Sequence, residues 1–370
     1  MAVDDDFDPV PPAVSIETLS HCFGQGSMRR QVLENISLSI PKKGDCICLL
    51  GPSGIGKTTV LRAIAGLIKI PSGSIILKEK ILNNNNIFVE PEERNVSLSF
   101  QENALFPHFT VEENIKFGIQ RSLFCSKNKN GPLKFSMEEL LDLFFISNLK
   151  KKYPHEISAG QAQRVCVVRS IIHNPDLLLL DEPFANLDQN LTEKVQINLK
   201  EILKEAGMTS IIVTHDKYEA FYLADYCGIL LDKKMVQFDK PYNIHHKPNS
   251  KEVVDFFNRG VLISAKVIGK NKLFNEELGE IQGEFSKDYP LNEQVELLIQ
   301  PEDLIHDDES DLKLEVVDKK FRGTNFVYTL KTGSNNLLPV FVHSHHEHLH
   351  QENEKFGIKK PIFIDHLVCF

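Results

Sequence analysis

One segment, Gly51-Pro-Ser-Gly-Ile-Gly-Lys-Thr58, constrains the fold of this 370-residue chain more than any other feature. It fits the pattern G-x-x-x-x-G-K-[ST], whose glycines let successive backbone N–H groups face one phosphate. An apolar run, Asp45–Leu50, precedes it, and a helical pattern from Lys57 to Lys69 follows it. The pattern alone arises by chance in roughly one chain in a hundred. Between a strand and a helix, whose N-terminus favours an anion, it predicts an α/β P-loop NTPase fold.

The second informative segment is the run Leu177–Leu180, followed by Asp181 and Glu182. Four leucines predict a buried strand, and ligands of open α/β sheets bind at the carboxyl ends of such strands. Asp181 is placed to reach Mg²⁺, and Glu182 to polarise the attacking water. The alternative is a strand that ends in two solvated acids, and the phosphate loop upstream argues against it. A helix over Leu191–Ala206 and a strand over Ser210–Thr214 continue the α/β alternation.

The rest of the chain divides by pattern. Val14–Ile40 alternates as antiparallel strands do, and residues 102–156 are helix-rich with an expected loop at Ser126–Pro132. From Val261 onward the apolar runs are short, alternating and separated by turn residues, which predicts a small all-β, OB-like domain. We expect a flexible N-terminus over 1–12, an ATPase domain over 13–240 with a helical insert over about 102–158, a linker over 241–260, and a β regulatory domain over 261–370.

Composition excludes several classes of protein. Lys and Arg number 42 and Asp and Glu number 51, so the net charge is −9, and this balance gives no global drive toward nucleic acid. A hydrophobic fraction of 42% excludes a mainly disordered chain. No apolar run reaches the roughly 18 residues of a membrane span, and Met1–Pro12 lacks the pattern of a signal peptide. The seven cysteines contain no CxxC pair and are expected to be reduced thiols.

A third motif is Ser158-Ala159-Gly160-Gln161, with Gln163 and Arg164 after it. Ser158 is a plausible helix N-cap, and Val165, Val168 and Ile172 share one helical face, so a capped amphipathic helix would explain it. The segment also resembles the LSGGQ signature of the ABC-transporter ATPases. Further motifs of that family follow its order along the chain: Gln101 (Q-loop), Leu187-Asp188 (D-loop) and Thr214-His215-Asp216 (H-loop).

The resemblance implies roles for individual residues. Lys57, Glu182 and His215 would be catalytic, and Mg²⁺ would be held by Thr58, Gln101 and Asp181. Phe23 would stack on adenine, although a buried strand Phe is the alternative. ATP would also contact a group of residues in the same chain: Gly51, Pro52, Ser53, Gly54, Ile55, Gly56, Lys57, Thr58, Thr59 and Gln101. A second copy of the chain, arranged head to tail, would contribute another group: Ser158, Ala159, Gly160, Gln161 and Asp188.

The sequence departs from the family at a few positions. Ala159 stands where a glycine is usual, which adds a methyl near the γ-phosphate. Lys234 and Asp239 replace usual turn glycines, and Gln300 replaces a usual arginine in the strand Val295–Gln300.

The arrangement of one ATPase domain and a small β domain resembles the ATPases of bacterial solute importers. Such a subunit works with a transmembrane permease and, indirectly, a periplasmic or extracellular solute-binding protein, peripherally on the cytoplasmic side of the membrane. Leu105-Phe106-Pro107, within the expected permease-contacting segment Glu102–Gly118, would equally serve as local core. The nearest resemblance is to the ferric-iron importer group; spermidine/putrescine and sugar importers share nearly all the motifs. A non-transport ABC ATPase of DNA repair or translation is a further alternative.

A histidine-rich segment, His343-Ser-His-His-Glu-His-Leu-His350, lies outside these motifs. Imidazoles and a carboxylate are ligands for transition metals. The simpler interpretation, a polar loop between strands, is the one we favour.

Overall fold

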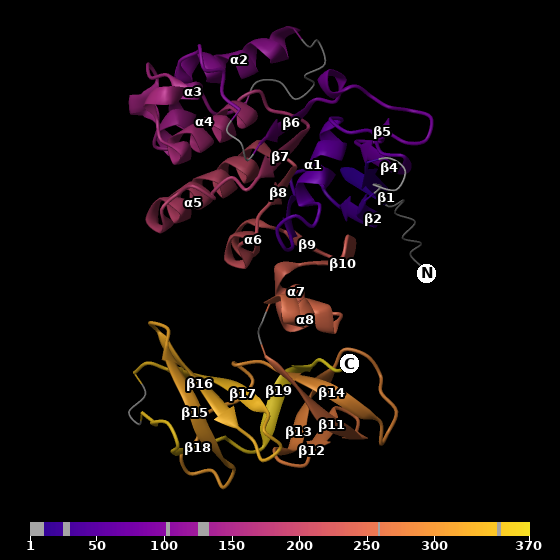
Figure 1. Ribbon diagram of the computed structural model, residues 1–370, viewed down its shortest axis with the longest axis vertical. Helices are drawn as coiled ribbons and strands as arrows, with labels where there is room; N and C mark the ends of the chain where they lie inside the picture. Colours follow the sequence, from indigo (N-terminus) through magenta and orange to yellow (C-terminus); the bar gives the residue numbers. More distant parts are fainter. Residues whose placement is uncertain (1–10, 25–29, 101–103, 125–132, 258–259, 346–348) are drawn as a thin grey trace, which may run out of the picture. The chain divides into compact units, whose positions relative to one another are not determined.

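The structure is a computed structural model that describes residues 11–24, 30–100, 104–124, 133–257, 260–345 and 349–370. The chain forms two compact units, Met1–Pro241 and Tyr242–Phe370 (Figure 1). Each is described by itself below.

The first unit contains two sheets. An antiparallel sheet has the order β2-β1-β4-β5, and a mostly parallel sheet has the order β10-β9-β3-β8-β7-β6. The strands of the first are β1 (Val14–Phe23), β2 (Arg30–Ile40), β4 (Ser72–Leu77) and β5 (Lys80–Asn83). Those of the second are β3 (Cys46–Leu50), β6 (Val96–Ser99), β7 (Leu177–Asp181), β8 (Ser210–Val213), β9 (Tyr226–Leu231) and β10 (Lys234–Asp239). The α/β class and the antiparallel start predicted from sequence are confirmed.

Helix α1 (Lys57–Ala65) packs between the two sheets (Figure 1). Val60, Leu61 and Ile64 share one core with strands of both sheets. In β7, Leu177 and Leu179 belong to this core, whereas Leu178 and Leu180 do not, although all are fully buried. Successive strand residues point to opposite faces, so the unbroken leucine run indicates a strand covered on both sides.

Helix α1 ends at Ala65, earlier than the pattern to Lys69 predicts, because Gly66 adopts φ 82°. The buried Arg94 stabilises this end. Its guanidinium donates hydrogen bonds to the carbonyl oxygens of Ala63 (2.9 Å) and Ile64 (2.8 Å) in the last turn of the helix. A Cβ at Gly66 would lie 2.5 Å from the Arg94 Nε. Burial lowers the pKa of Arg94 to about 10.

The helical part of this unit follows β6. It contains α2 (Val111–Phe124), α3 (Met137–Leu143), the 3-10 turns Ser147–Leu149 and Pro154–Glu156, and α4 (Ala159–Ile171). The loop expected at Ser126–Pro132 lies outside the described residues. Helix α4 is buried around most of its circumference, including Gln163 and Arg164. The sequence predicts a helix with one buried apolar face, marked by Val165, Val168 and Ile172, and one exposed polar face. The prediction of an exposed polar face is wrong, because polar residues of α4 are buried as well.

The described part of this unit also contains α5 (Gln189–Ala206), α6 (Lys217–Leu223) and the 3-10 turn Pro91–Glu93. The hairpin β9–β10 shows which turn positions need special backbone conformations. Asp232 and Lys233 have positive φ values of 44° and 69°, whereas Lys234 and Asp239 do not. Lys234 therefore lies beside the turn and Asp239 at the far end of β10, and neither has a positive φ.

The described residues of the second unit form strands apart from two short helices, α7 (Pro241–His246, which begins at the unit boundary) and α8 (Lys251–Phe257). One sheet has the order β14-β11-β12-β13-β19, and the other β17-β16-β15-β18. Their strands are β11 (Val261–Gly269), β12 (Lys272–Asn275), β13 (Gly279–Phe285), β14 (Gln294–Ile299), β15 (Lys313–Phe321), β16 (Asn325–Lys331), β17 (Leu337–His343), β18 (Lys355–Gly357) and β19 (Ile362–Leu367). Both sheets share one hydrophobic core.

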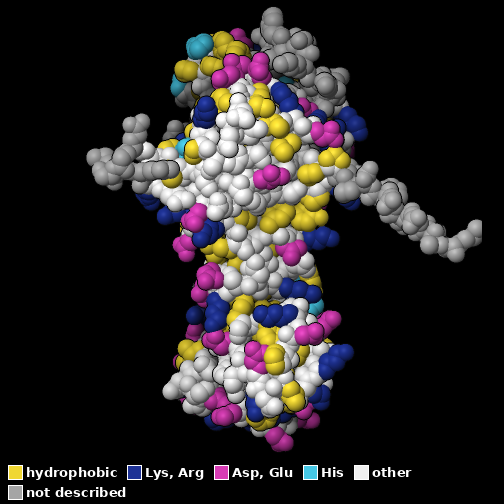
Figure 2. Space-filling view, turned by 90° about the vertical axis from the view of Figure 1, so that its right-hand side faces the viewer, with side chains coloured by type: hydrophobic (Ala, Val, Ile, Leu, Met, Phe, Trp, Pro, Cys, Tyr) yellow, Lys and Arg dark blue, Asp and Glu magenta, His cyan; other side chains and the backbone are white. Residues whose placement is uncertain are grey.

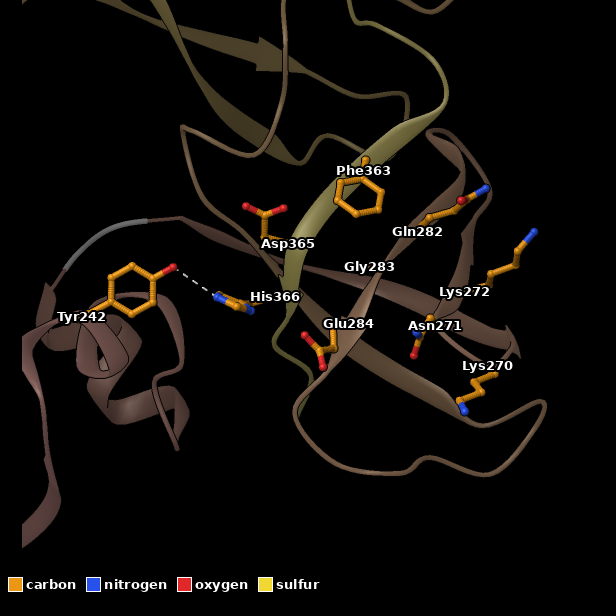
Figure 3. A pocket seen from close by; sticks show the side chains of 10 residues that line it. All are labelled: Tyr242, Lys270, Asn271, Lys272, Gln282, Gly283, Glu284, Phe363, Asp365 and His366. Carbon is orange, nitrogen blue, oxygen red and sulfur yellow. Dashed lines mark hydrogen bonds between the residues drawn. The ribbon is translucent and has the colours of Figure 1, made fainter.

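The segment 241–260 is expected to be a linker from sequence, and that role stays a prediction. The structure shows that Val254 of α8 packs against Leu298 and Val368 of the β domain. In Figure 3, Tyr242 at the start of α7 points to His366 of β19, and its hydroxyl lies 3.3 Å from the His366 Nε2. The described part of this segment thus packs with the second unit.

The surface charges, the helix lengths and the cysteines of the structure can be compared with what the composition predicts. Figure 2 shows side chains of both charge signs interspersed over the visible face. Among the helices that the structure describes, none is long and apolar enough to cross a membrane. The six cysteines in the described ranges are free thiols.

Candidate nucleotide-binding and hydrolysis site

Three adjacent strands bring the predicted chemistry to one edge. β3 pairs in parallel with β8, and β8 pairs in parallel with β7. The phosphate loop leaves the carboxyl end of β3, Asp181 and Glu182 end β7, and His215 follows β8. Residues more than 100 positions apart in the sequence therefore meet at the edge where α/β sheets bind their ligands.

The middle of the phosphate loop is exposed to solvent, whereas its two ends are buried. Pro52, Ser53 and Gly54 are exposed, whereas Gly51, Gly56 and Lys57 are buried. Gly56 adopts φ 113°, and a Cβ there would lie 2.7 Å from Leu33 Cδ2, so the turn into α1 requires glycine. Ile55 packs against the core below, and Thr59 is buried within α1.

The side chain of Lys57 binds back to the start of the phosphate loop. Its Nζ donates hydrogen bonds to the carbonyl oxygens of Gly51 (2.6 Å) and Pro52 (3.0 Å). Burial lowers the pKa of Lys57, and the nearby Glu182 and Asp181 carboxylates oppose that shift. The ammonium group is therefore held at the base of the loop, opposite two carboxylates.

Asp181 fits the requirements of a magnesium ligand. It is 3% exposed, and its Oδ1 has no hydrogen-bond partner among the described residues. Burial raises its pKa, while a hydrogen bond from the Thr58 hydroxyl lowers it. An unpaired carboxylate oxygen in a buried site is costly, and a cation beside Thr58 would offset that cost.

Glu182 and His215 face each other at this edge. Their Oε1 and Nδ1 atoms are 3.6 Å apart, with the Glu182 side chain 16% exposed and that of His215 62% exposed. Glu182 has φ 47°, a conformation that a non-glycine residue adopts at a cost and that occurs at functional sites. The pair combines a partly buried carboxylate with an accessible imidazole.

Gln163 is a site residue whose role the sequence did not reveal. Its side-chain Nε2 donates a hydrogen bond to the backbone carbonyl of Glu182. Its Oε1 accepts hydrogen bonds from the Asn186 backbone N–H (3.2 Å) and side-chain Nδ2 (3.1 Å). This buried amide connects α4 to the loop after β7, and so to the backbone of Glu182.

The signature segment begins α4 with a reciprocal cap. The Ser158 hydroxyl accepts from the Gln161 N–H (3.3 Å), and the Gln161 side chain accepts from the Ser158 N–H (2.9 Å). The predicted N-cap at Ser158 is confirmed. Ala159 is exposed in the first turn, whereas a Cβ at Gly160 would lie 2.4 Å from the Asn186 carbonyl oxygen. Asp188 is the N-cap of α5 and accepts from the Leu191 N–H (3.0 Å).

Phe23 and Gln101 are two further site residues predicted from the sequence. Phe23 ends β1 and is 45% exposed, so the buried-strand alternative is wrong for it. Its ring meets the His21 ring edge-on, with centroids 4.7 Å apart. Gln101 lies outside the described residues.

The segment expected to contact a permease, Glu102–Gly118, is described from Ala104 onward. The buried Asn114 holds it: its side chain donates to the carbonyl oxygens of Phe106 (3.2 Å), Phe109 (3.1 Å) and Thr110 (3.0 Å). Phe106 is partly exposed and packs on the rings of Phe109 and Phe117. A preorganised apolar surface results, of which Leu105 and Phe106 are half-buried members.

A separate pocket of about 620 Å³ opens on the second unit. Figure 3 shows Lys270 and Lys272 around the β11–β12 turn, with Phe363, Asp365 and His366 on β19. Two lysines and two carboxylates, Glu284 and Asp365, line it, so its charge favours neither anions nor cations.

The chain is similar to known proteins over most of its length. Residues 33–185 match the family described as "ABC transporter". It is 35% identical over 260 residues to the Fe(3+) ions import ATP-binding protein FbpC 2 of Haemophilus influenzae, covering 70% of each chain. It is 34% identical over 299 residues to the spermidine/putrescine import ATP-binding protein PotA of Clostridioides difficile, covering 80% of this chain and 82% of that protein.

Its fold is similar to that of a solved ATP-binding cassette. The dimeric cassette MJ0796, in a post-hydrolysis state bound to ADP and Pi, matches with TM-score 0.53 and 27% identity, covering 62% of this chain and 98% of that one. The site geometry and these similarities agree, and the chain belongs to the ABC transporter family as an ATP-hydrolysing subunit of the importer type.

Proposed function

We propose that this chain couples ATP hydrolysis to the uptake of ferric iron, or a related inorganic ion, through a separate permease. The observation that supports the ATPase part most strongly is the meeting of Lys57, Asp181, Glu182 and His215 at one sheet edge, with Glu182 and His215 3.6 Å apart. The names of the FbpC relatives support iron. The PotA relatives support the alternative, a spermidine/putrescine importer, and a sugar importer is a further alternative.

The reaction is in-line attack of water on the γ-phosphoryl group, with catalysis by positioning and charge neutralisation. Glu182 accepts a proton from the attacking water, and His215 orients that water and the γ-phosphate. Lys57 exchanges its hydrogen bonds to the Gly51 and Pro52 carbonyls for bonds to phosphate oxygens. Mg²⁺ held by Thr58, Asp181 and Gln101 would neutralise phosphate charge.

A second copy of the chain completes the site in this proposal. Helices α1 and α4 each present an N-terminus, and the positive ends of two helix dipoles suit the same phosphate. In a head-to-tail dimer with two-fold symmetry, Ser158, Ala159, Gly160, Gln161 and Asp188 of one copy contact the ATP held by the other. The dimeric cassettes among the similar solved structures support this arrangement.

Partners and location follow from the importer assignment. The permease-contacting surface is the aromatic segment that Asn114 holds, and Phe23 stacks on adenine. The chain works peripherally at the cytoplasmic face of the membrane and, indirectly, with a solute-binding protein. The importer names of the relatives argue against a role in DNA repair or translation.

The catalytic assignment is tested with Glu182→Gln. The amide keeps the shape of the carboxylate but cannot accept the proton from water, so we expect hydrolysis to fall at least about 100-fold while ATP binding is kept. Glu219→Gln is a matched control, because Glu219 lies near the same edge but bonds to the Thr214 hydroxyl (2.5 Å). Wild-type turnover in Glu182→Gln would assign the base to another group.

The substrate is tested by uptake. The chain is reconstituted with its permease and binding protein in vesicles, and ATP-dependent uptake of labelled ferric iron, spermidine and maltose is compared. Uptake of iron that Glu182→Gln abolishes supports the proposal. Uptake of spermidine or maltose alone would replace the substrate and leave the ATPase assignment in place.

A further inference from the structure

Outside the ATPase site, the described residues contain two groups of potential metal ligands, both in the second unit: His245, His246 and Glu302, and His306, Asp308 and His350. In the first group, His245 and Glu302 are 3.0 Å apart, and the His245 side chain is 17% exposed, against 6% and 5% for the two histidines of the second group. In the second group every pair of ligand atoms is close, and both imidazoles are buried. The second group is therefore the better-formed site.

Three atoms of this group converge on one point. His306 Nε2 and His350 Nε2 are 2.8 Å apart, His306 Nε2 and Asp308 Oδ1 are 3.1 Å apart, and His350 Nε2 and Asp308 Oδ1 are 3.0 Å apart. If only one of the two Nε2 atoms carries a proton, that proton cannot point at both other atoms of the triangle at once. If both Nε2 atoms carry a proton, the two protons face each other and repel. A cation attracts the lone pairs of all three atoms at once.

The size of the triangle indicates a coordination geometry. For metal–ligand bonds of about 2.1 Å, ligand atoms lie about 3.4 Å apart around a tetrahedral ion and about 3.0 Å apart around an octahedral one. The observed separations of 2.8, 3.0 and 3.1 Å match one face of an octahedron. Two histidines and one carboxylate on such a face form a known ligand set for divalent iron and similar ions.

The surroundings hold the ligands in place. His306 bridges to Ile358, and the Asp307 N–H donates to the Gly357 carbonyl (3.0 Å), so backbone pairing with the β18 region fixes one side. The His306 and His350 rings lie 4.4 Å and 5.0 Å from the Phe356 ring. Their side chains are only 6% and 5% exposed.

Access from solvent also fits a metal site. The Asp308 side chain is 38% exposed and gives an entry path from solvent. On the far side of the His350 ring, the Glu354 Oε2 accepts from the Gln351 N–H (2.7 Å) and lies 4.0 Å from the His350 Nδ1, which is longer than a hydrogen bond. Lys319 donates to the His350 carbonyl (3.1 Å) and anchors the backbone there.

We propose that His306, Asp308 and His350 bind one divalent first-row transition metal ion in octahedral coordination, with water in the remaining positions. The ion attaches the end of the β17–β18 connection at His350 to the His306–Asp308 segment. It therefore stabilises the second unit and makes its stability depend on metal. The histidine-rich segment contributes through His350 alone among its described members. The exposed His343 and His345 stack on each other, with ring centroids 5.7 Å apart.

The test uses the full chain, without a histidine tag and after chelator treatment, titrated with Co²⁺ by calorimetry in the absence of nucleotide. The variants are Asp308→Asn and His306→Gln; the matched control is the double variant His343→Gln/His345→Gln. We expect one saturable site in the wild type and the control, at least tenfold weaker binding in both site variants, and a weak octahedral-type Co²⁺ absorption spectrum. Co²⁺ should also raise the melting temperature of the wild type and the control, but not that of Asp308→Asn.

Asp308→Asn decides the outcome if His306→Gln does not fold, because it changes an exposed carboxylate and keeps its size. Equal Co²⁺ affinity in Asp308→Asn and wild type would overturn the proposal, as would loss of binding in the His343→Gln/His345→Gln control or no saturable site in the wild type. An intense tetrahedral-type spectrum would overturn the octahedral assignment. Mg²⁺ in place of Co²⁺ should give no saturable binding at this site, since imidazole ligands disfavour it.

Discussion

The side-chain amide of Gln163, on the signature helix α4, donates a hydrogen bond to the backbone carbonyl of Glu182, the residue that we propose activates water. The Glu182 backbone N–H donates in turn to the Val213 carbonyl (2.9 Å). Glu182 is therefore held from two sides in its left-handed conformation of φ 47°. The helix that would contact the nucleotide of a second copy is thus bonded directly to the backbone of Glu182, the proposed hydrolytic residue of its own chain.

The first prediction concerns this bond. Gln163→Glu keeps the side-chain shape and an oxygen for Asn186, but places an acceptor against the Glu182 carbonyl. We expect kcat for ATP hydrolysis to fall about tenfold or more, with ATP affinity unchanged, because only the position of Glu182 is disturbed. The matched control is Gln196→Glu, at another buried glutamine, in α5. Unchanged kcat in Gln163→Glu would show that the bond does not position Glu182.

A second prediction separates two neighbouring small residues of the signature. Gly160→Ala forces a Cβ to within 2.4 Å of the Asn186 carbonyl oxygen, so we expect a loss of about 1–3 kcal/mol in the free energy of unfolding of the first unit. Ala159→Gly, at an exposed position in the first turn, should cost less than about 1 kcal/mol. Denaturation in the absence of nucleotide measures both. Equal effects would mean that the loop after β7 moves away at little cost.

The third prediction concerns pH and Asp303. Burial raises its pKa to about 7 from the ordinary 3.8, although its carboxylate accepts from the Gln300 N–H (2.6 Å). Between these two values the folded chain binds a proton that the unfolded chain has lost, so stability falls as pH rises through that window. At about 1.36 kcal/mol per pH unit, the decrease amounts to at most about 4 kcal/mol.

Asp303→Asn removes this titration and keeps the acceptor oxygen. The variant should lose less stability than the wild type between about pH 5 and about pH 8, as measured by calorimetry of thermal unfolding. Asp311→Asn, at an exposed aspartate, is the control and should follow the wild type. Identical pH profiles for Asp303→Asn and wild type would show that Asp303 is ionised in the folded chain at neutral pH.

Local features of this fold could be predicted because local sequence determines them. The phosphate loop lies between an apolar strand and a helix, and four successive leucines before two carboxylates predict a strand covered on both faces. The cap at Ser158 depends on residues three positions apart. These signals place Lys57, Asp181 and His215 at strand ends, and parallel pairing then brings those ends together.

Contacts that depend on tertiary packing could not be predicted. The partners of Gln163 lie about 20 residues away in sequence, and Arg94 ends a helix some 30 residues earlier, with no periodicity to indicate either. The surroundings of the described histidines in the segment 343–350 likewise depend on tertiary packing. His343 is exposed at the end of β17, and His350, buried, finds its partners near residue 306. His343 and His350 therefore have different surroundings, although they are close in sequence.

The central claim, that each ATP site is shared by two copies of the chain, is tested most directly with a mixed dimer. One copy carries Lys57→Ala, a second and differently tagged copy carries Ser158→Arg, and both carry Glu182→Gln so that bound ATP is retained. If sites are built across chains, the mixed dimer has one site with both defects and one with neither. The account predicts occlusion of about one ATP per mixed dimer and little in either homodimer. A mixed dimer that forms but occludes no ATP would contradict it.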